Sequence, residues 1–173
     1  MVLIRKEREE DREGVWEVNV GAFGRPDEAE LVDRLREADA VTLSLVGVLD
    51  GRIVGHVLFS PVVLEMDGGR TAKSPSFGVG LGPVAVLPEY QSQGFGSQLI
   101  GEGIGQCREA GQSFMVVLGH SGYYPRFGFR PSLEFNIRSQ FDVPPEVFMV
   151  MQLKEGALRN KVGLVKYRPE FGS

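Results

Sequence analysis

The chain has 173 residues, a length that fits one domain with a hydrophobic core of its own. Its formal net charge is −4 and no basic stripe is visible, which excludes a general nucleic-acid-binding protein. A single cysteine, Cys107, excludes an internal disulfide framework, and no apolar run reaches the ~18 residues of a membrane-spanning helix. The N-terminus shows no signal-peptide pattern, so we expect a cytoplasmic protein without a membrane partner.

The first third of the chain alternates a short apolar run with two helical patterns. We predict a strand over 2–5, a helix from about residue 10 to 22, and a second helix over 28–38. Asp27 is expected to be the N-cap of the second helix, with Glu30 as its capping-box partner.

A hairpin is expected next. Asp50-Gly51 is a strong signal for a two-residue turn, and it separates predicted strands over 41–49 and 52–60. Pro61 is expected to end the second strand or to mark a sheet edge, because proline has no backbone N–H for the ladder. We predict a further strand over 62–66 and a loop over 70–80.

The rest of the chain alternates apolar runs with turn residues and helical patterns. The predicted strands cover 84–87, 114–118, 148–153 and 163–167, another opens at residue 129, and the predicted helices cover about 94–110 and 123–127. The complete order is β-α-α-β-β-β-α-β-α-β-β. We therefore expect an α/β fold, with a mixed sheet and helices on both of its faces.

The junction after the strand over 84–87 has the features of an anion site. Pro88 ends the strand, and a turn that contains Gly94 and Gly96 leads into a helix. The first N–H groups of a helix have no intrahelical partner and carry partial positive charge. Because the two glycines have no side chain, a phosphate could approach this backbone closely.

Two well-known phosphate loops do not fit this turn. The dinucleotide fingerprint G-x-G-x-x-G would need a glycine where Leu99 stands, and a P-loop would need a lysine within the turn. The pattern that remains is Q/R-x-x-G-x-G/A, formed here by Gln91, Gly94 and Gly96. It resembles the pyrophosphate loop of the GCN5-related N-acetyltransferases.

A second motif strengthens this resemblance. Tyr124 to Phe129, YPRFGF, is similar to the Y-x-x-x-G-F element of that family. The segments GHSGYYPRFGFRP, IVGHVLFSPV and AELVDRLR resemble a subgroup of predicted bacterial acetyltransferases, although His120 stands where that subgroup usually has aspartate. The resemblance covers most of the chain and implies a single acetyltransferase domain over 1–173.

The resemblance also implies a co-substrate and a reaction. The family transfers the acetyl group of acetyl-CoA to a primary amine of a small molecule or peptide by direct attack. The turn would hold the pyrophosphate, the strand before it would meet the pantetheine arm, and the N–H of Val86 or a neighbour would polarise the thioester carbonyl. The implied cofactor-binding residues are Val84, Ala85, Val86, Gln91, Ser92, Gln93, Gly94, Phe95, Gly96, Ser97 and Tyr124.

Tyr124 is the candidate general acid, because a phenol with a pKa of ~10 can deliver a proton to a departing thiolate whose thiol has a pKa of ~8.5. The general base stays open. His56 is the first candidate, although a lone histidine in a strand is more often a structural residue. His120, Glu28, Glu30 and Asp67 are the other candidates.

Other function classes have less support. The segment GHSGY is not a nucleophile elbow, since Tyr123 stands where glycine is required, and two histidines without a metal-ligand pattern lead us to expect no metal. The alternative to an enzyme is a non-catalytic acyl-CoA-binding regulatory module on the same fold. Residues 23–27 and 131–147 are expected to grip the amine, whose identity stays open, as does a homodimer.

Overall fold

A computed structural model describes residues 1–69 and 74–172 of the chain. Its α-helices are α1 (Arg12–Phe23), α2 (Asp27–Glu37) and α3 (Phe95–Glu109). Its strands are β1 (Leu3–Lys6), β2 (Leu43–Leu49), β3 (Arg52–Met66), β4 (Ser76–Val86), β5 (Phe114–Leu118), β6 (Arg130–Pro131), β7 (Ile137–Ser139), β8 (Phe148–Gln152) and β9 (Gly163–Lys166). Short 3₁₀ helices include η3 (Pro88–Tyr90), η4 (Tyr124–Phe127) and η7 (Pro169–Phe171).

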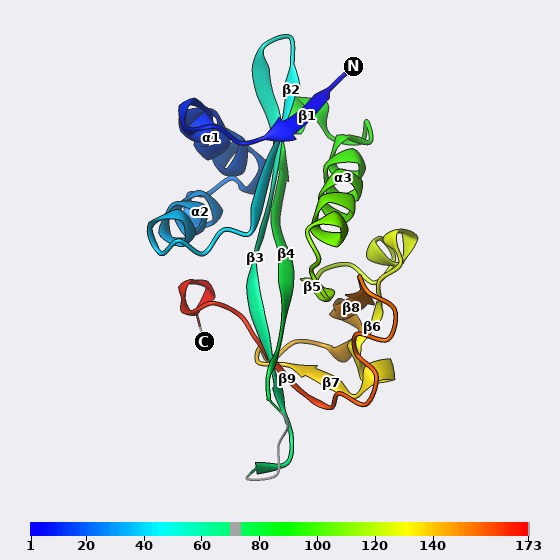
Figure 1. The fold of residues 1–173 in the computed structure, drawn as a ribbon. Helices are drawn as coiled ribbons and strands as arrows, with labels where there is room; N and C mark the ends of the chain where they lie inside the picture. Colours follow the sequence, from blue (N-terminus) through cyan, green and yellow to red (C-terminus); the bar gives the residue numbers. More distant parts are fainter. Residues whose placement is uncertain (70–73, 173) are drawn as a thin grey trace. The chain divides into compact units, whose positions relative to one another are not determined.

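The strands form a mixed sheet in the order β1-β2-β3-β4-β5-β8-β6, and β9 pairs with both β3 and β7 (Figure 1). β4 runs parallel to β5 and β7 runs parallel to β9, whereas β2 is antiparallel to both of its neighbours. The α/β fold predicted from the sequence is therefore confirmed. None of the helices in the described ranges is long and apolar enough to cross a membrane.

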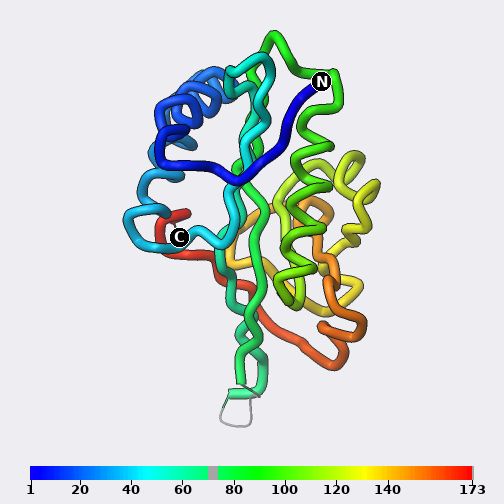
Figure 2. The backbone as a smooth tube through the Cα atoms, turned by 45° about the horizontal axis from the view of Figure 1, so that its top comes forward, coloured from blue at the N-terminus to red at the C-terminus, as the bar shows by residue number. Residues whose placement is uncertain are grey.

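Contacts divide the chain into two compact units. The first contains Met1–Ser60 and Gly82–Gln106, and the second contains Pro61–Leu81 and the chain from Cys107 onward. β3 and β4 run through both units, and Figure 2 shows these two neighbouring strands side by side.

In the first unit, α1 and α2 lie on one side of the strands and α3 lies on the other (Figure 1). Successive side chains of a strand point to opposite faces, and β3 shows the consequence. A Cβ atom on Gly55 would lie 2.8 Å from Leu99 Cδ1 of α3, whereas the next residue, His56, contacts Asn19 of α1. A core cluster of this unit contains Val2, Val18, Val54, Ala85 and Leu87.

The second unit has a core cluster around the β5–β8 pair. Phe114 and Val116 of β5 are buried together with Phe148 and Val150 of β8. The cluster is completed by Val62, Leu64, Ile137, Leu158 and Val165.

The structure corrects two sequence predictions about β3 and β4: Pro61 does not end its strand, although it does lie at an unpaired stretch of the strand's edge, and β4 begins earlier than predicted. β3 continues through Pro61, because its pairing with β2 ends at Phe59 and its pairing with β9 begins at Val63. Pro61 falls in the gap between these two ladders, where its missing N–H leaves no bond unmade. Ser76–Gly80, predicted as part of a loop, belongs to β4, and residues 70–73 of that predicted loop lie outside the described residues.

The predicted capping box of α2 is also wrong. Pro26 occupies the N-cap position, and its carbonyl oxygen accepts a hydrogen bond from the Glu30 N–H at 2.8 Å. Asp27 is thus the first residue inside the helix, where its charge still favours the positive N-terminal end.

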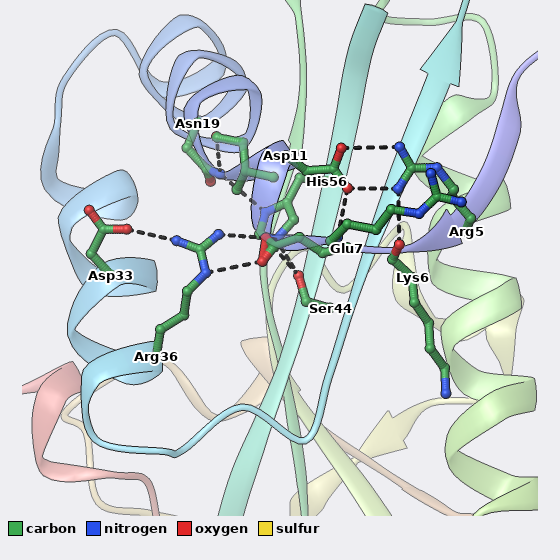
Figure 3. A network of polar contacts seen from close by, with 11 residues as sticks. Arg5, Lys6, Glu7, Asp11, Asn19, Asp33, Arg36, Ser44 and His56 are labelled. Atoms are coloured by element: carbon green, nitrogen blue, oxygen red, sulfur yellow. Dashed lines mark hydrogen bonds and ion pairs between the residues drawn. The ribbon is translucent and has the colours of Figure 1, made fainter. Parts of the chain in front are cut away.

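A buried polar network joins α1 to β2 and β3 (Figure 3). Asn19 Nδ2 donates to the Val15 carbonyl oxygen at 2.9 Å, which fixes the orientation of the amide, and it lies 3.1 Å from His56 Nδ1. Since an amide nitrogen only donates, His56 Nδ1 accepts. His56 Nε2 therefore carries the proton and donates to Ser44 Oγ at 2.9 Å.

The same network continues to α2 and to the residue after β1. Ser44 Oγ lies 3.3 Å from Glu7 Oε1, and Arg36 Nε donates to the Glu7 carboxylate at 3.0 Å. Arg36 also contacts Asp33 at 2.7 Å. The His56 side chain has no exposed surface, and burial together with the positive charge of Arg36 lowers the pKa of His56 to about 3.

The glycines of α3 differ in their surroundings. A Cβ atom on Gly103 would lie 2.3 Å from the Phe59 ring of β3, whereas a Cβ atom on Gly101 or Gly105 would meet nothing within 4 Å. Close packing on the sheet therefore explains Gly103 but neither of the other two.

Alanine at Gly103 is predicted to destabilise the fold by roughly 1–3 kcal/mol, because the new methyl group would overpack against Phe59. Alanine at the matched position Gly101 is predicted to stabilise it by about 1 kcal/mol, the gain in helix propensity. Urea unfolding of both variants measures the two changes, and equal effects at the two positions would contradict this packing.

The stability of the fold is predicted to fall on mild acidification because of His56. The unfolded chain takes up a proton near pH 6.5, whereas the folded chain keeps His56 neutral until about pH 3. The free energy of unfolding is therefore highest above pH 6.5 and falls as the pH falls. The expected loss is about 2 kcal/mol between pH 7 and pH 5. Urea unfolding across this range measures the slope. Replacing His56 with asparagine should flatten this pH dependence, whereas replacing the exposed His120 with asparagine should not. A wild-type stability that does not change with pH would refute the prediction.

Candidate functional site

The predicted anion turn is exposed and opens into α3. Gln91, Ser92, Gln93 and Gly94 are exposed, and Gly94 has a φ of +86°. The Gly94 carbonyl oxygen accepts a hydrogen bond from the Gln98 N–H at 3.0 Å, which is the first helical bond. The N–H groups of Phe95 and Gly96 come before this first bond and are not used by the helix ladder, the arrangement that favours an anion.

The space beside Gly94 is open. A Cβ atom at this position would have Gln98 Nε2 as its nearest neighbour, 4.0 Å away. At Gly96 a Cβ atom would make only an ordinary contact with Val86 Cγ2, at 3.8 Å. Apart from the residues on either side of it, Gly94 thus leaves room for a ligand beside its backbone.

The last residues of β4 have a backbone edge that β5 does not cover. β4 pairs with β5 over Val79–Leu81 in the described residues. Further along, the Leu87 N–H donates to the Val54 carbonyl oxygen of β3 at 2.9 Å. Because successive residues of a strand direct their backbone groups to opposite edges, those of Val84 and Val86 point away from β3.

Side chains of the turn also support its shape. Gln91 Nε2 donates to the Val86 carbonyl oxygen at 2.9 Å, and Gln93 Nε2 donates to the Glu89 carbonyl oxygen at 3.3 Å. Phe95 stacks on Tyr90 with ring centroids 6.3 Å apart. Ala85 is buried in the core, and Ser97 is partly buried in the first turn of α3. The structure thus gathers the predicted residues from Val84 to Ser97 in one unit.

Tyr124 lies in η4 of the second unit, in a group of aromatic rings. Its ring packs against Gly119, where a Cβ atom would be only 2.2 Å away, and meets Phe129 edge to face with centroids 5.8 Å apart. Gly128 ends η4 with a φ of +105°. Burial raises the pKa of Tyr124 to about 12, so its phenol stays protonated at neutral pH. The Y-x-x-x-G-F motif therefore has a packing role in this fold.

The predicted general bases lie in different surroundings. His56 is buried and held by Asn19 and Ser44, so it could reach a substrate only through that network; its catalytic role stays a prediction. His120 is exposed. Glu28 is paired with Arg25, which lowers the pKa of Glu28, and Asp67 is held in the same way by Arg138; Glu30 is exposed. In the part of the chain that the structure describes, no three His, Cys, Asp or Glu side chains cluster in a way that could hold a metal.

Sequence reasoning missed the polar partners of His56. Asn19 is fully buried, and it follows the core residues Val15 and Val18 on the same helix. A polar residue at such a core position could have indicated a buried polar contact, because buried polar groups require a hydrogen-bond partner. Nothing in the sequence indicated that this partner would be His56.

Comparisons with known proteins agree on one family. Residues 3–132 match the family model described as an acetyltransferase (GNAT) domain. The N-acetyltransferase YhbS of Escherichia coli K12 is 34% identical over 171 residues, which cover 98% of each chain. YjhQ, another E. coli N-acetyltransferase, is 42% identical over 125 residues, or 70% of this chain and 65% of YjhQ.

Two solved structures resemble the fold closely. Crystalline E. coli YhbS in complex with CoA has a TM-score of 0.90 and 35% identity, over 99% of this chain and 92% of that one. A GNAT family acetyltransferase from Brucella melitensis in complex with acetyl-CoA has a TM-score of 0.78 and 38% identity, over 99% of this chain and 98% of that one. With its strand, glycine turn and helix in the same order as the family motif, this chain belongs to the GNAT family of N-acetyltransferases.

Proposed function

We propose that the protein transfers the acetyl group of acetyl-CoA to a primary amine of a small molecule or peptide by direct attack. The observation that carries this proposal is the exposed turn at Gly94, which opens directly into the N-terminus of α3. Two relatives with 35% and 38% identity were crystallised with CoA and acetyl-CoA, which supports the same donor here.

The residues present fit this donor. The diphosphate would meet the N–H groups at the start of α3, where Gly94 leaves room for it. The amide groups of the pantetheine arm would pair with the edge of β4 formed by Val84 and Val86. Val86 lies closer to the turn along the chain, so we assign it to the pantetheine and assign the N–H of Val84 to the acyl end.

Bound acetyl-CoA supplies a carbonyl carbon activated by its thioester sulfur. As the C–N bond forms and the C–S bond breaks, the amine nitrogen loses one proton and the sulfur gains one. The Val84 N–H would stabilise the negative charge on the carbonyl oxygen. Tyr124, which keeps its proton because its pKa is about 12, would deliver that proton to the sulfur.

The amine nitrogen also needs a proton acceptor. His56, with a pKa of about 3, binds a proton too weakly to take one from an ammonium group at neutral pH. In the reaction, His56 would act by holding Ser44, and through Ser44 the Glu7 carboxylate, in place. The cytoplasmic location, the single-domain organisation and a homodimer stay predictions.

The competing function is a regulatory module that binds acyl-CoA without turnover. The packing of Tyr124 against Gly119 is consistent with this alternative, because a structural role alone would account for the tyrosine. Release of free thiol from acetyl-CoA across a panel of primary amines separates the two. Turnover is expected with at least one amine, and binding of acetyl-CoA without turnover on any of them would favour the module.

Replacing Tyr124 with phenylalanine is predicted to lower kcat by a factor of about 100, within the range of general acid catalysis, while the ring keeps its packing. The wild-type kcat should not fall between pH 8 and pH 10, because the phenol loses its proton only near pH 12. Phenylalanine in place of the neighbouring Tyr123 is the matched control and should retain most of the rate. Equal rates for the wild type and the Tyr124 variant would contradict the assigned role.

A further inference from the structure

A pocket of about 180 Å³ lies within the second unit and is formed by residues between 132 and 148. Its walls are mostly apolar and come from Leu133, Phe141, Val143, Pro145 and Phe148. A cavity of ~150 Å³ is enough to hold benzene, whereas drug-sized ligands fill at least ~300 Å³. The pocket therefore has room for a single ring or a single side chain, but not for a whole cofactor.

The apolar walls extend from the core of the unit to its surface. Phe148, at the start of β8, is buried in the core cluster, and Val143 packs against that cluster. Leu133 is 55% exposed and Pro145 is exposed. An apolar group that enters the pocket would thus remove exposed apolar surface from water, which favours binding.

Two of the three polar side chains that line the pocket are already engaged. Ser139 Oγ accepts a hydrogen bond from the Phe141 N–H at 3.0 Å. The two terminal nitrogens of Arg138 donate to the carboxylate of Asp67 at 2.9 and 2.8 Å. Among these described lining residues no charge is left unpaired. A charged group in the pocket would lose hydration without meeting a free opposite charge, so the occupant is uncharged.

Ser132 is the third polar side chain and is only 2% exposed. It is the first residue of η5 (Ser132–Phe135), and its carbonyl oxygen accepts from the Asn136 N–H. Its hydroxyl forms no hydrogen bond with the described residues. A hydrocarbon that filled the pocket would enclose this hydroxyl without a partner, which is costly. The occupant must therefore bring a hydrogen-bonding atom of its own.

We infer that the pocket binds an uncharged aromatic ring that carries a hydroxyl group, with Ser132 as the hydrogen-bond partner of that group. The rings of Phe141 and Phe148 favour an aromatic occupant, because aromatic rings attract one another edge to face or offset-stacked. A phenol hydroxyl can donate or accept, as the serine hydroxyl can, so the bond forms in either sense.

Two sources would supply such a ring. One is the acceptor amine, because residues 131–147 were expected to grip it, and the other is a separate phenolic molecule. The inference goes beyond the proposed function and does not depend on it.

The test measures the binding of p-cresol and of toluene to the full chain without acetyl-CoA, by ligand-observed NMR titration. The wild type should bind p-cresol roughly 10-fold more tightly than toluene, the contribution of one hydrogen bond in an enclosed site. Ser132→Ala should remove this preference and leave the affinity for toluene unchanged. The melting temperature of this variant should not fall, because the lost hydroxyl has no protein partner.

Two control variants separate the hydroxyl from the shape of the pocket. Ser139→Ala should keep the preference for p-cresol, because the Ser139 hydroxyl is engaged by the Phe141 N–H. Val143→Phe should weaken the binding of both compounds, because the larger ring fills the pocket. Equal affinities of the wild type for p-cresol and toluene, an unchanged preference in Ser132→Ala, or full binding by Val143→Phe would each overturn the inference.

The source of the ring is identified by a comparison of tyramine with phenethylamine in the thiol-release assay. A preference for tyramine in kcat/KM that Ser132→Ala removes would identify the acceptor amine as the source. Equal kcat/KM values, with p-cresol still preferred over toluene, would support a separate phenolic molecule. Failure of every amine would overturn the proposed function and leave the p-cresol result standing.

Discussion

The backbone of β4 has two edges, and in the described part of the chain a neighbouring strand pairs with only one of them along the last part of β4. On one edge the chain stays bonded to β3 as far as Leu87. On the other, the described pairing with β5 covers Val79–Leu81. Strand geometry then directs the amides of Val84 and Val86 to the edge without β5. An extended ligand with amide groups of its own can form hydrogen bonds with this edge, as a neighbouring strand would. The turn at Gly94 follows β4 directly in the chain.

His56 shows why a residue type does not define a role. Its position in a strand beside a candidate site made it a reasonable proton acceptor, but the fold surrounds it with Asn19 and Ser44 and removes it from water. A neutral imidazole held at both nitrogens organises the elements around it, and its low pKa makes the stability of the unit depend on pH. The network links α1, α2, β2 and β3 through side chains that lie far apart in the sequence.

Local chemistry explains which parts of the fold were predictable. The hairpin turn followed from Asp50-Gly51, whose φ values of 49° and 76° are those that this residue pair tolerates best. The end of η4 followed from Gly128, and the start of α3 from the glycine turn. Each signal lies within a few residues of the feature it specifies.

Features that depend on distant partners were not predictable. The strand through Pro61 requires β9, about a hundred residues later, and the glycine-rich start of β4 requires rings from Phe114 and Tyr167. The contact between Asn19 and His56 spans 37 residues. For the candidate site, the turn was predictable because Gly94 and Gly96 lie two residues apart in the sequence. The surroundings of His56 were not, because they depend on tertiary packing.

The central claim is that the turn at Gly94 holds the diphosphate of CoA, and calorimetric titration with CoA tests it most directly. Aspartate at Gly94 would place a side chain and a negative charge beside the diphosphate, and the affinity should fall by at least about 10-fold. Aspartate at Gly111 is the matched control, since Gly111 is also exposed and has nearly the same φ, +87°. The Gly111 variant should bind CoA as the wild type does. No binding by the wild type, or equal binding by the Gly94 variant, would contradict it.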